Sequence, residues 1–81
     1  MTFEKAFVFQ KLEGISNYLA EIRDLLKFSD KQILNDYLKL RSLERLLQLV
    51  VDEMIDINQH FIGELNLKIS EDLQGTFYQN F

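Results

Sequence analysis

The sequence predicts an all-α protein: an antiparallel helical hairpin with the start of a third helix, as part of an up-down helical bundle completed by dimerisation. Three observations lead to this fold class. The chain contains no Pro and is 47% apolar, two long segments place apolar residues at every third or fourth position, and a helix-capping pattern lies between them. Short connections between long amphipathic helices favour antiparallel neighbours.

The first predicted helix covers residues 3–28. Thr2 is a suitable N-cap, and Glu4 suits the positive end of the helix dipole. Gly14 costs about 1 kcal/mol relative to Ala but does not end the helix. The apolar residues alternate spacings of four and three, which gives the helix one core-facing side: Val8, Leu12, Ile15, Leu19, Ile22 and Leu26.

The turn follows directly. Ser29 and Gln32 have the spacing of a capping box, in which two side chains satisfy backbone donors at a helix start. The next helix either runs straight from Asp30 or restarts after a short turn near Asn35 and Asp36, since these are also good cap residues.

The second long helix is predicted from Tyr37 to about Gly63. One side is apolar and is the candidate interface: Leu40, Leu43, Leu47, Val50, Met54, Ile57 and Phe61. The other side carries a narrow polar ridge: Arg41, Arg45, Gln48, Asp52, Asp56 and Gln59. Burial of the apolar side requires a partner surface.

The regular spacing is lost between Gly63 and Ile69, so we predict a connection there, with a helical turn at residues 70–74. Thr76 and Gln79 have the spacing of a second capping box, which predicts the start of a third helix. We therefore expect residues 1–81 to be a single helical domain, the N-terminal part of a longer bundle.

The size of the chain favours a homodimer. A domain of 81 residues buries only about 60% of the surface that its unfolded chain exposes. Two helices alone leave apolar surface in water. Pairing two hairpins into a four-helix bundle, with helices crossing at about 20°, buries that surface.

Composition argues against several other classes. The chain has no Cys, which rules out disulfides and thiolate metal sites. Nine basic against thirteen acidic side chains give a net charge of −4, which does not support a broad electrostatic grip on nucleic acid. The N-terminus does not resemble a secretory signal, and no segment is long and apolar enough to span a bilayer. We expect a cytoplasmic protein with no membrane partner and no cofactor.

Three polar residues of the second long helix recur every four positions: Asp52, Asp56 and His60. One interpretation is a metal site. Di-metal bundle proteins, however, combine Glu-x-x-His pairs from several helices, whereas Ile57 precedes His60 by three residues and the chain has one His. A solvated polar ridge is the favoured interpretation, and no metal ligand is predicted.

His60 also raises the question of catalysis, because imidazole suits general-base chemistry. No Ser, Cys or second acid stands at motif spacing from it, so it is predicted to be a polar residue near a helix end, and no catalytic residue is predicted. Arg45, Asp52 and Asp56 form either surface ion pairs or a ridge that clamps a partner; the surface pairs are favoured.

Three segments together resemble the HepT-like proteins of the HEPN superfamily. Residues 45–62 (RLLQLVVDEMIDINQHFI) resemble the second helix of that family, with its Arg, an acid seven residues later, another acid four further on, and a His near the helix end. Residues 19–26 (LAEIRDLL) and 73–81 (LQGTFYQNF) resemble the flanking helices. The resemblance covers nearly the whole chain.

This resemblance implies a homodimeric ribonuclease toxin of a prokaryotic toxin-antitoxin module, whose antitoxin is a minimal nucleotidyltransferase. Members carry an Arg, four to six residues, a His and then a Tyr; the Arg and His serve RNA cleavage, and the antitoxin modifies the Tyr. Here the nearest upstream Arg, Arg45, stands fifteen residues before His60. We therefore expect this chain to supply dimer-forming helices without the catalytic motif, with RNA a substrate only of a longer parent. A non-enzymatic protein-interaction module is the alternative.

Overall fold

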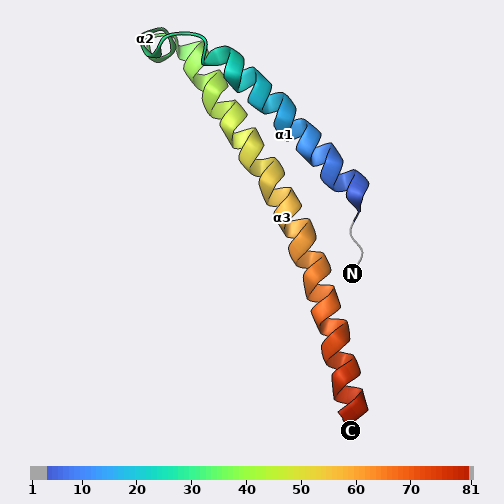
Figure 1. Cartoon of the computed structure of the whole chain (residues 1–81). Coiled ribbons are helices and arrows are strands. Elements are labelled where there is room, and N and C mark those ends of the chain that lie inside the picture. Colours follow the sequence, from blue (N-terminus) through green and yellow to red (C-terminus); the bar gives the residue numbers. More distant parts are fainter. Residues whose placement is uncertain (1–3, 81) are drawn as a thin grey trace.

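The protein is an open hairpin of helices, described by a computed structural model for residues 4–80, with side chains described for residues 4–69. Three helices follow one another: α1 (Lys5–Leu25), α2 (Asp30–Leu34) and α3 (Tyr37–Asn80). Figure 1 shows α1 lying along the first half of α3, with α2 at the bend that joins them. The all-α hairpin predicted from the sequence is confirmed.

Helix α1 has the predicted position with slightly shorter ends. It begins after Glu4, whose extended backbone marks the N-cap. The predicted cap, Thr2, lies outside the described residues. Gly14 is inside the helix, as expected. At the other end the backbone N–H of Leu26 donates to the carbonyl of Ile22 at 2.9 Å, and Arg23 in the last turn suits the negative end of the dipole.

The turn follows the second of the two alternatives: the helix that begins at Asp30 ends at Leu34, and a new helix begins at Tyr37. Ser29 caps α2 with the predicted capping box: its Oγ accepts from the backbone N–H of Gln32 at 3.2 Å, and the Gln32 side chain accepts from the Ser29 backbone N–H at 2.9 Å. Helix α2 lasts only five residues. Asp36 then caps α3, because its Oδ1 accepts from the backbone N–H groups of Leu38 and Lys39 at 3.0 and 3.3 Å.

The predicted break after Gly63 and the predicted third helix at Thr76 are wrong. Helix α3 is continuous over 44 residues. No glycine among the described residues has a positive φ. Gly63 therefore keeps a helical backbone, and α3 does not end there. Apolar residues also continue at helical spacing through Ile62, Leu65 and Ile69. Their positions are shifted by one residue relative to the predicted apolar side that ends at Phe61.

The core of this hairpin is thin. Among the described side chains, the buried hydrophobic residues are Ile22 and Ile33, at 8% and 6% exposure. The molecule measures 68 × 21 × 14 Å, and its radius of gyration of 20.1 Å far exceeds the value of about 12 Å expected for a compact domain of this length. Each helix therefore keeps much apolar surface outside the contact between α1 and α3.

Candidate functional site

A set of polar contacts fixes how α1 lies on α3. Lys11 Nζ on α1 lies 2.9 Å from Asp56 Oδ2 and 3.6 Å from Glu53 Oε2 on α3. The hydrogen bond to Asp56, with a smaller electrostatic contribution from Glu53, raises the pKa of Lys11 above its usual range. Gly14 faces the same carboxylate: a Cβ placed there would be 3.3 Å from Glu53 Oε2. The antiparallel register is thus set by an ion pair and a close approach.

His60 lies inside α3 and against the beginning of α1, so its predicted place near a helix end is wrong. Its Nε2 accepts a hydrogen bond from the backbone N–H of Glu4 at 3.2 Å. Its ring lies 4.9 Å from the ring of Phe7, tilted by 38°. This hydrogen bond satisfies one of the backbone donors at the start of α1. This role is structural.

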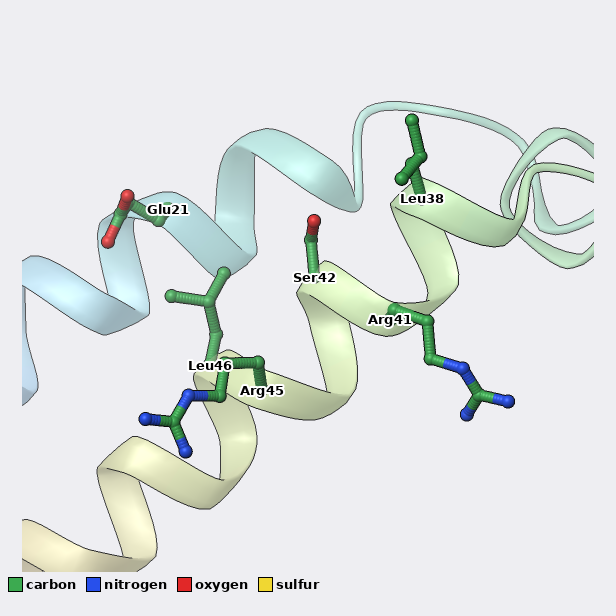
Figure 2. Close-up of a pocket in the computed structure, with 6 residues that line it drawn as sticks. All are labelled: Glu21, Leu38, Arg41, Ser42, Arg45 and Leu46. Carbon is green, nitrogen blue, oxygen red and sulfur yellow. The ribbon is translucent and has the colours of Figure 1, made fainter.

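One side of the hairpin carries a shallow polar groove of about 400 Å³ (Figure 2). Six residues line what we call the polar groove: Glu21, Leu38, Arg41, Ser42, Arg45 and Leu46. Figure 2 shows Glu21 on α1 and the other five on α3, with Ser42 and Leu46 directed toward α1 and Arg41 directed away.

Neighbours on α3 hold both guanidinium groups of the polar groove. Arg41 Nη1 lies 2.6 Å from Glu44 Oε2, and its guanidinium lies 4.8 Å from the centre of the Tyr37 ring. Hydrogen bonds with Tyr37 and then Glu44 raise the pKa of Arg41. Arg45 Nη1 is 3.5 Å from the Gln48 side-chain oxygen. An anion would have to compete with these partners for both arginines.

The opposite side of the hairpin is apolar. On α3 it carries a row of large side chains that are each 45–56% exposed, which we call the apolar stripe: Leu47, Val51, Met54, Ile55, Ile62, Leu65 and Ile69. On α1 and its C-cap residue it carries three leucines that are 47–59% exposed, which we call the α1 leucine row: Leu12, Leu19 and Leu26.

Helical spacing places the apolar stripe and the α1 leucine row on the same side. Because the helices are antiparallel, residues rotated in the same sense away from the α1–α3 contact lie on one face. Near the bend, this face contains an apolar hollow of about 260 Å³ lined by Leu26, Asp30, Ile33, Leu34, Leu40 and Leu43. Leu26 directly follows α1, and the other lining residues belong to α2 and α3.

The predicted interface residues fall into two groups. Five are partly buried: Leu40, Leu43, Val50, Ile57 and Phe61. Leu47 and Met54 are 50% and 51% exposed and belong to the apolar stripe. Their role in a dimer stays a prediction. Five residues of the apolar stripe were not predicted from the sequence, although their regular spacing on either side of Asn58 was an available signal: Val51, Ile55, Ile62, Leu65 and Ile69.

The predicted polar ridge is divided between different surroundings. Asp56 pairs with Lys11 on α1, Arg45 lines the polar groove, and Asp52 is exposed. Among the described side chains, no group of three His, Asp or Glu lies close enough to hold a metal ion. Within the described part of the chain, no helix has the length and apolar character needed to cross a membrane.

The chain was compared with known proteins. The profile of one family, ribonuclease HepT-like, matches residues 15–79. The match includes the second half of α1, the bend and nearly all of α3. No curated protein and no solved structure matches. Since the matched segment is well over half of the sequence, the chain belongs to the ribonuclease HepT-like family.

Proposed function

We propose that this chain supplies the dimer-forming helices of a HepT-like ribonuclease toxin, which acts in a toxin-antitoxin module with a minimal nucleotidyltransferase as antitoxin. The observation that carries the proposal is the apolar face of the hairpin, where large side chains of the apolar stripe and the α1 leucine row are about half exposed. Contiguous apolar surface of this extent marks a protein interaction site. The resemblance to HepT-like proteins implies a homodimer, so we take a second copy as the partner.

The same proposal assigns no RNA cleavage to these helices. The 81 residues contain no Arg followed by a His after four to six residues, and His60 is engaged with the backbone of Glu4. The polar groove has two arginines, but both have partners on α3, and the chain carries a net charge of −4. The paired arginines and the negative net charge both disfavour strong binding of RNA phosphates.

The dimer is tested by sedimentation equilibrium over roughly 1–100 µM protein. Met54→Lys places a charge in the apolar stripe and is expected to shift the protein toward monomer by at least tenfold in dissociation constant, because a buried unpaired charge is costly. Leu38→Lys is the matched control, since Leu38 is 76% exposed and lines the polar groove on the other side. A wild-type monomer, or equal effects of both variants, would contradict the proposal.

A second experiment tests the enzymatic part. The purified chain is incubated with total RNA, and we expect no cleavage above the level of a buffer control. Cleavage that disappears in His60→Ala would show that the active residues lie within these helices. A third outcome concerns the antitoxin. If a nucleotidyltransferase encoded beside the gene co-purifies with the wild type but not with Met54→Lys, the antitoxin binds the apolar face. That result would favour the alternative, a protein-interaction module.

A further inference from the structure

Six of the seven residues of the apolar stripe are arranged symmetrically about Asn58. Leu47, Val51 and Met54 stand 11, 7 and 4 residues before Asn58, and Ile69, Leu65 and Ile62 stand 11, 7 and 4 residues after it. Asn58 itself is exposed and lies on the same side of the helix. These six residues therefore form three pairs at equal distances from one polar residue, and Ile55 has no counterpart in the apolar stripe.

Such a pattern is self-complementary for two antiparallel helices. When a two-fold axis passes beside one residue, every position before that residue faces the equivalent position after it in the partner. With the axis at Asn58, Leu47 faces Ile69, Val51 faces Leu65 and Met54 faces Ile62 of a second copy. Asn58 then faces Asn58 of the other copy, and each amide has both a donor and an acceptor to offer.

The length of α3 points to the same axis. Helix α3 runs from Tyr37 to Asn80, so Asn58 is at its midpoint. An antiparallel pair centred there overlaps along its entire length. Figure 1 shows the second half of α3 continuing well past the start of α1, without another helix beside it. That half is about 30 Å long for residues 61–80. It is therefore available to lie in a groove of a partner.

The hairpin offers a groove of matching position. The contacts of Lys11 with Glu53 and Asp56 set an antiparallel register, in which Leu12 and Met54 stand at one level along the hairpin and Leu19 and Leu47 at another. All four of these side chains are about half exposed. In the antiparallel pair, Ile62 of the second copy meets Leu12 and Met54, and Ile69 of the second copy meets Leu19 and Leu47.

We propose that two copies of this chain pair through α3, antiparallel and centred on Asn58, so that the second half of each α3 fills the apolar groove of the other hairpin. This inference rests on the proposed dimer and adds its geometry. Asn58 sets the register, because any shift places its amide against an apolar side chain and leaves it without a hydrogen-bond partner.

Disulfide crosslinking tests the axis directly, because the wild-type chain has no Cys. Asn58→Cys places two thiols next to the two-fold axis, within the Cα separation of about 7 Å that a disulfide allows. We expect mild oxidation to convert most of the protein to covalent dimer. Leu47→Cys alone is the matched control: its two copies lie 22 residues apart along the helix, about 33 Å, and no crosslink is expected.

A mixture of Leu47→Cys, carrying an affinity tag, with untagged Ile69→Cys gives an independent readout. We expect tagged and untagged chains in one covalent dimer. Crosslinking of Leu47→Cys with itself would show a parallel pair and overturn the inference. If light scattering finds a dimer but neither Asn58→Cys nor the mixture crosslinks, this geometry is wrong and the proposed dimer stands. If light scattering finds a monomer, both are wrong.

The role of Asn58 has its own test. Asn58→Leu removes the only polar side chain between Met54 and Ile62 on this side of the helix. We expect a lower dissociation constant for the dimer together with a lower yield of the crosslink between positions 47 and 69, since neighbouring registers become populated. An unchanged yield would overturn the register-setting role. Gln59→Leu, on the adjacent polar side, is the control and is expected to leave the yield unchanged.

Discussion

Ile22 and Ile33 are the side chains on which the hairpin depends most. Both lie near the bend, where α1 and α2 meet the beginning of α3, and both are buried. Polar residues add local stability close by: Lys39 Nζ lies 2.7 Å from Asp36 Oδ2 and 4.5 Å from the centre of the Phe28 ring. The best-packed part of the molecule is therefore the bend.

The first prediction compares a buried with an exposed aliphatic residue. Ile22→Ala is expected to lower the free energy of unfolding by about 2–5 kcal/mol, because it removes buried methylene groups and leaves a cavity. Leu38→Ala, at a position 76% exposed, is expected to change it by less than about 0.5 kcal/mol. Urea unfolding followed by circular dichroism measures both. Similar losses in the two variants would mean that Ile22 is not a core residue.

The second prediction concerns pH. Hydrogen bonds from the Lys39 side chain, and then from the backbone N–H groups of Lys39 and Leu38, lower the pKa of Asp36 below its usual 3.8. Since the pKa is lower in the folded state, the stabilisation is present above pH 4 and is lost as the pH falls through the folded value. Asp36→Asn keeps an oxygen for the cap but has no charge to lose.

Thermal melts of wild type and Asp36→Asn from pH 7 to pH 2 check this. The wild type is expected to melt at the higher temperature near neutral pH, and the difference is expected to shrink below pH 4. The remaining carboxylates titrate in both proteins, so their effects cancel in the difference. A difference that stays constant over this range would contradict the assigned charge effect.

At the scale of helices, continuity of α3 is the main departure from the sequence-based fold. An isolated glycine costs a helix only about 1 kcal/mol, which the hydrogen bonds and apolar contacts of neighbouring turns offset. A Cβ at Gly63 would meet no atom within 4 Å, whereas one at Gly14 would press on the Glu53 carboxylate. The two glycines thus have different reasons to be present: Gly14 permits a close approach of α1 to α3, and Gly63 does not.

The third prediction follows from this contrast. Gly63→Ala is expected to raise the free energy of unfolding by about 0.5–1 kcal/mol, through higher helix propensity and a less flexible unfolded chain. Gly14→Ala is expected to gain less, because the carboxylate that pairs with Lys11 must move aside. Urea titrations of the two variants, analysed together, give the comparison. Equal gains would show that the approach at Gly14 is not constrained.

At the scale of the whole molecule, the hairpin lacks the burial that a stable domain of its length requires. Its radius of gyration and its half-exposed apolar face both describe an element that needs a neighbour. A partner that binds only the folded state adds its binding free energy to stability, so the melting temperature then depends on concentration.

The fourth prediction uses that dependence. The melting temperature of the wild type is expected to rise by several degrees when protein concentration is raised a hundredfold, because folding and pairing are coupled. Met54→Lys is expected to melt at a lower temperature that does not change with concentration. Differential scanning calorimetry of both proteins makes the measurement. A wild-type melting temperature independent of concentration would contradict coupling to a second copy.

The sequence by itself determined the all-α class, the capping box at Ser29 and the family, and it offered Asp36 as one of two cap residues, since these depend on spacing and hydrogen bonds within a few residues. The tertiary structure decided how each helix is rotated about its axis. Apolar residues cover much of the circumference of α3, so spacing alone did not show which side meets α1. Packing decided it: Gly14 admits Glu53, Lys11 reaches Asp56, and His60 meets the start of α1. The apolar stripe is the side that those contacts leave uncovered.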